Sequence, residues 1–213
     1  MRDHPRSEQF FTEVEKERLS AAVRDIESRT IGEVVVMVVD SSDPYGDVEI
    51  VGSLLGAGSL SLLLTILLLH SSLLWFITIM FLLLAPSHLL FTRVARLKTL
   101  FIGTQRKNEA VRERALRAFF EKELYRTRES SGVLFLLSLL ERKVWILADR
   151  GIYEKIDQGT LNQFAATVSQ GVKRGHACDA LVEAIQDVGQ LLSKHFPIKP
   201  GDINELPDRV IKG

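Results

Sequence analysis

The stretch LLLTILLLHSSLLWFITIMFLLL, residues 62–84, decides the fold, because the sequence on either side of it has the composition of a water-soluble domain. No Asp, Glu, Lys or Arg occurs from residue 50 to residue 92. A bilayer core of about 30 Å needs only about 20 apolar helical residues. His70, Ser71 and Ser72 interrupt the apolar run near its middle. The sequence therefore predicts two membrane helices, residues 50–69 and 73–91, joined by a tight turn.

A pair of buried helices in a soluble protein is the alternative interpretation of this run. A chain of 213 residues is too short to surround two helices that are apolar on all sides. Trp75 and Phe91 stand where aromatic side chains are favoured at a membrane interface. Gly52 and Gly56 form a GxxxG pattern, which gives the first helix a small face for close packing. We therefore expect a transmembrane hairpin at residues 48–92.

The basic residues beside the hairpin predict its orientation. Counted within about 20 residues of the spans, the preceding flank offers only Arg29. The following flank offers six basic residues, which are Arg93, Arg96, Lys98, Arg106, Lys107 and Arg112. The N-terminal sequence MRDHPRSEQF has no apolar core of a signal peptide. Since two spans leave both flanks on one side, we expect a multi-pass membrane protein with its soluble domain in the cytoplasm.

Overall charge and cysteine content exclude two classes. The chain has 27 basic and 27 acidic residues, so it lacks the excess of positive charge typical of nucleic-acid binding. Cys178 is the only cysteine, which excludes an internal disulfide framework. We expect the lipid bilayer, and other membrane proteins, as partners, and no nucleic acid.

The flanks of the hairpin alternate helix and strand patterns. Thr12 and Glu15 form a capping box that begins a first helix, and EVVVMVV at residues 33–39 reads as a strand buried on both faces. Gly175 separates the last two helices. The further predicted elements are a basic interfacial segment at 93–103, an amphipathic helix from 104, strands at 133–140 and 143–148 and helices at 160–172 and 177–195. A flexible tail is expected at 197–213.

This order of elements predicts an α/β domain that the hairpin interrupts. A strand, a crossover containing a helix and a second strand form a βαβ unit, whose strands are parallel. Insertion into a surface loop is tolerated when the two ends of the loop stay close. We therefore expect a discontinuous domain made of residues 1–47 and 104–196.

Three stretches resemble the TPM domain family, in its membrane-anchored bacterial branch. They are FFTEVEKERLSAAVRDIESRTIGEVVVMVV, VRERALRAFFEKEL and, above all, YRTRESSGVLFLLSLLERKVWILADRGI. The resemblance implies a TPM-like α/β sandwich around a small mixed sheet, and a place in the bacterial inner (cytoplasmic) membrane. Members of the family include plant thylakoid proteins linked to photosystem II repair, for which acid phosphatase activity and calcium binding have been proposed. The hairpin within the domain departs from many members, which are extracytoplasmic.

One end of the predicted sheet gathers the candidate site residues. If the first two strands are parallel and the third is antiparallel, Glu33 and Asp149 fall at the same end, beside Arg126, Arg128 and Arg150. Two carboxylates near glycine-rich backbone can hold Ca²⁺, and arginines can pair with a phosphate or with a partner's carboxylate. The alternative is structural: Asp-Arg-Gly is ordinary turn chemistry, and Glu33 with an arginine is an ordinary ion pair.

Two functions remain open at this point. A membrane-tethered binding or assembly and maintenance module for membrane proteins requires no nucleophile, and the chain has no GxSxG, Walker, HExxH or GxGxxG motif. A metal-dependent, phosphatase-like hydrolase would require carboxylates and a metal near an anion site. The sequence favours the binding module.

Overall fold

The computed structural model describes residues 6–68, 72–199, 206 and 210–212. His70 and Ser71, placed by the sequence in the turn between the spans, lie outside these residues. Contacts divide the chain into two compact units, an α/β unit of residues 1–43 and 108–213 and a hairpin unit of residues 44–107. The helices are α1 (Arg6–Gln9), α2 (Glu13–Glu27), α3 (Gly46–Leu68), α4 (Leu73–Arg93), α5 (Ala95–Phe101), α6 (Thr104–Glu121), α7 (Arg150–Tyr153), α8 (Gln158–Arg174) and α9 (Ala177–His195).

The sheet of the α/β unit has the order β3-β2-β1-β4. Its strands are β1 (Glu33–Val39), β2 (Gly132–Ser138), β3 (Lys143–Ala148) and the short β4 (Ile211–Lys212). β1 pairs with β2 in parallel and β2 pairs with β3 antiparallel, which confirms the predicted mixed sheet. β4 adds a parallel pairing to Met37 and Val38 that the sequence did not predict.

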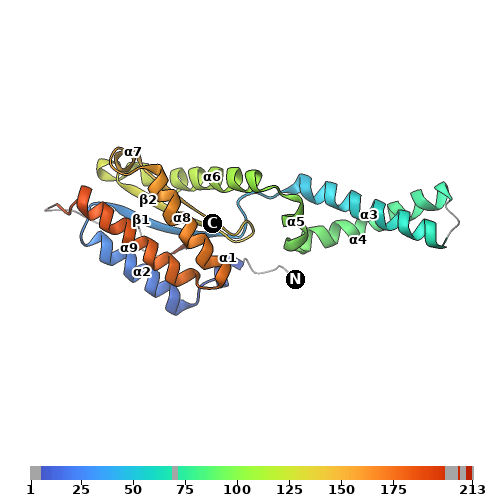
Figure 1. The fold of residues 1–213 in the computed structure, drawn as a ribbon, viewed down its shortest axis with the longest axis horizontal. Coiled ribbons are helices and arrows are strands. Elements are labelled where there is room, and N and C mark those ends of the chain that lie inside the picture. Colours follow the sequence, from blue (N-terminus) through green and yellow to red (C-terminus); the bar gives the residue numbers. More distant parts are fainter. Residues whose placement is uncertain (1–5, 69–71, 200–205, 207–209, 213) are drawn as a thin grey trace. The chain divides into compact units, whose positions relative to one another are not determined.

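Helices cover both faces of this sheet (Figure 1). One face packs the even-numbered residues of β1 and β3, such as Val36 and Ile146, against α2, α8 and α9. The other face packs Val35 and Met37 against the side chains of α6 from Val111 to Phe119. All seven residues of β1 and of β2 are buried, because both strands lie inside the sheet with helices on each side.

The ends of several helices follow from local chemistry that the sequence predicted. Thr12 and Glu15 form the capping box of α2, in which the Thr12 backbone N–H donates to Glu15 Oε2 at 2.8 Å. Gly175 ends α8 with φ of 84°, a left-handed conformation that favours glycine. One expectation was inaccurate, because β2 ends at Ser138 and not at residue 140. The turn to β3 contains Arg142 at φ of 52°.

The chain is fixed where it leaves β1 and β2. Ser42, Ser138 and Glu141 are all buried there. Glu141 Oε1 accepts from the Ser42 backbone N–H at 3.1 Å, and Ser42 Oγ donates to Ser138 Oγ at 2.8 Å. Ser138 Oγ in turn donates to Glu141 Oε2. This network ties the last residues before the hairpin to the β2–β3 turn.

Helices α3 and α4 of the hairpin unit are long and apolar enough to cross a membrane, each with a mean hydropathy of 2.1 over its candidate span. Their large side chains are exposed to a degree that water does not favour, for example Leu67 at 69%, Phe81 at 70% and Leu82 at 75%. A soluble core would bury them instead. The exposed apolar surface agrees with the predicted hairpin, and α3 begins at Gly46, four residues before the predicted start of the first span.

The two long helices pack through small and hydroxyl-bearing residues. A Cβ at Gly52 would lie 2.3 Å from Phe91 Cε1, so only glycine allows this approach. Ser61 Oγ donates to the Phe76 carbonyl at 2.7 Å, and Ser87 Oγ donates to the Ser53 carbonyl at 2.9 Å. These bonds place polar groups inside the hairpin, where no water is available in a bilayer.

The base of the hairpin holds ion pairs that involve the predicted basic segment. The helical conformation is interrupted at Val94, and the separate helix α5 follows. The basic segment therefore does not simply continue α4. Lys98 of α5 pairs with Glu49, and Arg106 pairs with both oxygens of Asp47 at 2.6 and 2.7 Å. The Arg106 guanidinium also lies over the Tyr45 ring, 5.3 Å from its centroid.

Candidate functional site

Glu33 and Asp149 lie at the same end of the sheet, on either side of Gly132. Glu33, the first residue of β1, is in register with Gly132. The Asp149 backbone N–H donates to the Gly132 carbonyl at 2.9 Å. One strand therefore separates the two carboxylate-bearing residues, as the predicted strand directions require.

The two carboxylates have different surroundings. Glu33 is buried, with 5% of its surface exposed. Asp149 caps the short helix α7, since its Oδ1 accepts from the Arg150 backbone N–H at 2.7 Å. Its Oδ2 is buried and has no hydrogen-bond partner within the described part of the chain. The capping bond is the turn chemistry that the sequence offered as its structural alternative.

The loop before β2 packs tightly against this end. A Cβ at Gly132 would lie 2.7 Å from the Leu124 carbonyl oxygen, and a Cβ at Gly151 would lie 2.3 Å from the Glu129 carbonyl oxygen. Glu129 and Ser130 have φ of 57° and 50°, in the left-handed region that non-glycine residues seldom adopt. The glycines at these positions are required by close backbone approach.

The predicted binding arginines pair within their own segments. Arg126 bonds Glu123 at 2.9 Å, and Arg150 bonds Glu154 at 3.2 Å. Both side chains are exposed, at 64% and 88%. The side chain of Arg128 lies outside the described part of the structure. The arginines therefore share the sheet end with Glu33 and Asp149, but no described bond joins the guanidinium group of Arg126 or Arg150 to either carboxylate.

The described side chains at this end do not include a cluster of metal-ligating groups. Among the described residues, no group of three or more His, Cys, Asp and Glu side chains is arranged to hold a metal ion. Ca²⁺ takes six to eight oxygen ligands, which include backbone carbonyls and water as well as carboxylates. The calcium site at Glu33 and Asp149 therefore stays a prediction.

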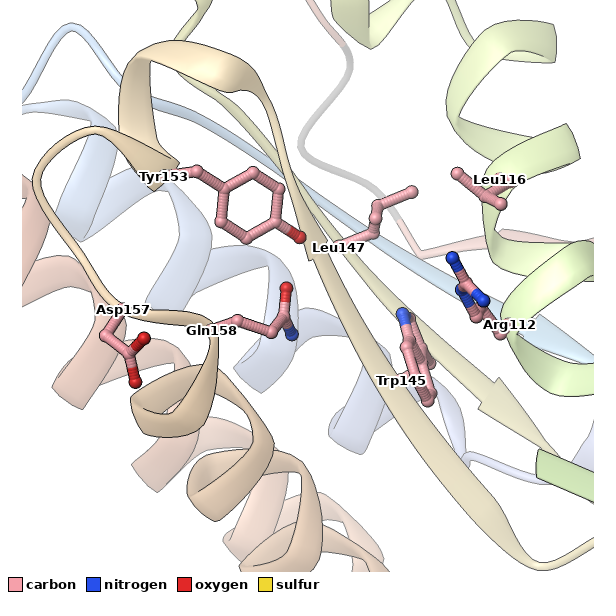
Figure 2. Close-up of a pocket in the computed structure, with 7 residues that line it drawn as sticks. All are labelled: Arg112, Leu116, Trp145, Leu147, Tyr153, Asp157 and Gln158. Atoms are coloured by element: carbon pink, nitrogen blue, oxygen red, sulfur yellow. The ribbon is translucent and has the colours of Figure 1, made fainter. Parts of the chain in front are cut away.

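A cavity of about 490 Å³ lies elsewhere in the α/β unit, at the outer edge of β3 (Figure 2). It is lined by Arg112 and Leu116 of α6, Trp145 and Leu147 of β3, Tyr153 of α7, and Asp157 and Gln158 at the start of α8. β3 ends the sheet on this side. The cavity therefore collects side chains from three separate stretches of sequence around one edge strand.

The edge of β3 is capped by two side-chain hydroxyls. The backbone N–H of Val144 donates to Ser169 Oγ at 3.1 Å, and that of Ala148 donates to Tyr153 Oη at 3.2 Å. Burial raises the pKa of the Tyr153 phenol above its usual value of 10.0, and the bond from Ala148 opposes this shift only in part. Tyr153 is thus neutral at physiological pH, and its hydroxyl proton is available to an acceptor.

The Trp145 indole has no acceptor among the described residues. Its Nε1 is buried and has no hydrogen-bond partner in the described ranges. A buried donor left without a partner costs about 1–3 kcal/mol. The sequence analysis missed this cavity, although one signal exists. Side chains alternate between two faces along the run KVWILA, which puts Trp145 on the face opposite Val144 and Ile146.

Comparison with known proteins supports the family resemblance over one segment. The model of the TPM domain family matches residues 92–191. The NMR structure of the BA42 protein from the psychrophilic bacterium Bizionia argentinensis is similar, with a TM-score of 0.60, 21% sequence identity and 96% coverage of each chain. At that identity the likeness shows the fold alone. No curated protein sequence matches the chain. Residues 92–191 are therefore similar to the TPM domain family, within an α/β fold like that of BA42.

Proposed function

We propose that this protein is a membrane-tethered binding module that acts in the assembly or maintenance of other membrane proteins. The observation that carries the proposal is the position of the hairpin between β1 and β2, which pair in one sheet. The chain on both sides of two apolar helices contributes to a single α/β unit. Such an arrangement tethers the folded domain to a bilayer through two connections of the chain.

The α/β unit faces the cytoplasm of a bacterial inner membrane in this proposal, and the chain crosses the membrane twice. Basic residues after α4 support this orientation. The ion pairs of Lys98 with Glu49 and of Arg106 with Asp47 do not weaken the argument, because acidic residues contribute little to the orientation rule. Arg93 and Lys107 add further positive charge on the same side.

Binding is favoured over hydrolysis by the described side chains at the sheet end. Arg126 and Arg150 are exposed, and their ion pairs with near neighbours in sequence are of the kind that contributes about 0–1 kcal/mol. These arginines can therefore exchange their present partners for a carboxylate of another protein at little cost. The hydrolase alternative lacks a comparable observation, because the described carboxylates do not form a metal site.

Cysteine labelling tests the orientation. In a Cys178→Ala background, we expect cysteines introduced at Glu13 or Lys155, both exposed on the α/β unit, to react only after the cells are permeabilised. A cysteine introduced at Ser72, beside the turn between the spans, should react in intact cells. The reverse pattern would overturn the cytoplasmic assignment.

Photo-crosslinking in native membranes tests the binding role. Crosslinkers placed at Arg126 and at Arg150 should each capture the same membrane protein, whereas a crosslinker at the exposed Arg24 of α2 should not. The pair of substitutions Arg126→Glu and Arg150→Glu should abolish capture by a crosslinker at Lys155, with little change in melting temperature. Metal-dependent hydrolysis of a phosphomonoester that Asp149→Asn abolishes would instead support the enzyme.

A further inference from the structure

The cavity at the edge of β3 presents hydrogen-bond donors from three elements. Arg112 contributes a guanidinium, Trp145 an indole N–H and Tyr153 a hydroxyl proton. Arg112 is exposed, and no described acidic side chain forms an ion pair with it. The Trp145 nitrogen lacks a described acceptor, and the Tyr153 oxygen already accepts from Ala148, which leaves its proton to donate.

The acceptors of the cavity are partly occupied. Asp157 Oδ2 accepts from the Gly159 backbone N–H at 2.7 Å, which caps α8. The Gln158 amide nitrogen donates to Asn162 Oδ1 at 2.9 Å, and this bond does not use the Gln158 carbonyl oxygen. Figure 2 shows Asp157 well separated in the view from the guanidinium of Arg112, which lies beside Trp145. The positive charge of Arg112 therefore lies on α6, and the negative charge of Asp157 lies at the start of α8.

Apolar side chains complete the lining. Leu116 belongs to α6, and Leu147 lies on the same face of the sheet as Trp145, the face that α6 covers. A volume of about 490 Å³ is within the range of cavities that bind small organic molecules. Donors converging beside apolar walls suit a ligand with an acceptor-rich group on an apolar body.

We propose that this cavity binds a small organic monocarboxylate with an aromatic or branched aliphatic body. The carboxylate accepts from the Arg112 guanidinium and from the Trp145 indole, and the body lies against Leu116 and Leu147. A charge-assisted bond to a guanidinium is the strongest contact available here, since both partners are ionised. Asp157 on the opposite side disfavours a second negative charge. The proposal does not depend on the membrane role.

Access to the indole nitrogen requires a movement of the side chains that cover it. The nitrogen is buried, and Arg112 is the long, exposed side chain beside it in Figure 2. In the proposal, rotation of Arg112 opens a path to the indole N–H and keeps the guanidinium at the rim. The same residue thus controls access and supplies the charge for the ligand.

The indole proton of Trp145 gives a direct test. The full chain carrying Trp75→Phe, in nanodiscs of phosphatidylcholine, has Trp145 as its remaining tryptophan. Titration with 3-phenylpropionate should move the indole N–H resonance downfield, as a new hydrogen bond forms. The uncharged 3-phenylpropanol should bind at least about tenfold more weakly, which corresponds to about 1.4 kcal/mol. Equal responses to the acid and the alcohol would overturn the proposal.

Matched variants locate the site. Arg112→Gln should weaken 3-phenylpropionate binding at least about tenfold, whereas Arg117→Gln, an exposed position on the same helix outside the cavity, should leave it unchanged. Equal losses in the two variants would show only a general effect of surface charge and would refute the assignment. Both variants should retain the melting temperature of the parent, which excludes unfolding as the cause.

A second pair of probes distinguishes two sources of the carboxylate. A carboxylate with an apolar body occurs on free metabolites and at the carboxyl end of a polypeptide. N-acetylphenylalanine should bind in either case, and a tetrapeptide ending in phenylalanine should bind only if the cavity admits a chain terminus. Amidation of the tetrapeptide should then abolish binding. Failure of 3-phenylpropionate and N-acetylphenylalanine together would overturn the proposal.

Discussion

The α/β unit and the hairpin unit use the same apolar residue types in opposite ways. In β2, Leu134 and Phe135 are fully buried between helices. In the hairpin, Leu67 and Phe81 leave about 70% of their surface exposed. Burial of apolar surface stabilises the α/β unit in water by roughly 25 cal/mol per Å². The hairpin unit gains the same stabilisation only when lipid covers its apolar surface. The difference agrees with the proposed membrane anchoring, in which water surrounds the α/β unit and lipid surrounds the hairpin.

The largest expected effect contrasts one phenylalanine in each unit. Phe135→Ala should lower the free energy of unfolding of the α/β unit by about 3–5 kcal/mol, because it opens a cavity among fully buried side chains. Phe81→Ala, at a site that is 70% exposed, should leave that free energy unchanged. Denaturant titration in detergent measures both. Similar losses in the two variants would mean that Phe81 packs in a protein core.

An arginine placed in the hairpin should have a much larger effect than an arginine placed on the surface of the α/β unit. Leu63→Arg, on a 53% exposed position of α3, should oppose membrane insertion by about 2.5–3.5 kcal/mol. Val14→Arg, on a 72% exposed position of α2, should have little effect on insertion or stability. Fractionation of membranes after alkaline washing gives the measurement. Full retention of the Leu63→Arg variant would argue against lipid contact at this face.

Helix packing within the hairpin provides a smaller effect. Gly52→Ala should destabilise the α3–α4 contact by about 1–3 kcal/mol, because its Cβ would lie 2.3 Å from Phe91. Gly58→Ala is the matched control, since no atom lies within 4 Å of its Cβ position. The yield of a disulfide between cysteines introduced at Ser53 and Ser87 reports the contact. A lower yield for Gly58→Ala than for Gly52→Ala would contradict the packing described.

The smallest effect concerns the cap of α2 and its dependence on pH. Bonds from Thr12, the one from its backbone first, lower the pKa of Glu15 below its usual value of 4.5. The cap therefore stabilises the fold above pH 4.5, and this contribution is lost as the pH falls through the lowered pKa of the folded state. Glu15→Gln should remove this part of the pH dependence, as measured by thermal unfolding. Thr12→Ala should cost about 1 kcal/mol at neutral pH.

Periodicity in the sequence was sufficient to predict the main elements. The β-branched run 33–39 became β1 without change, and the pattern from 177 to 195 became α9. The end of β2 was missed because Leu139 and Leu140 continue the apolar run while the backbone already turns. β4 was missed because two residues carry no pattern, and their pairing with β1 is decided by tertiary contact.

The candidate site was only partly predictable, for a physical reason. Strand direction alone brings Glu33 and Asp149 to one end of the sheet, so this placement could be predicted from the sequence. The local ion pairs of Arg126 and Arg150 depend on side-chain conformation, which no spacing rule determines. The cavity joins residues 112–116, 145–147 and 153–158, and it appears only after α6 and α8 have packed beside β3.

The pairing of β1 with β2 also sets an order of events during synthesis. Glu33 is in register with Gly132, so β1 leaves the ribosome 99 residues before its partner (132 minus 33). At about 5–20 residues per second this delay is roughly 5 to 20 s. The ribosome makes both apolar helices during that interval. The seven residues of β1, five of them valine, then still lack their partner strand β2. In the proposed membrane-anchored protein, targeting of the nascent chain therefore precedes closure of the sheet, and a chaperone that shields residues 33–39 would act in this interval.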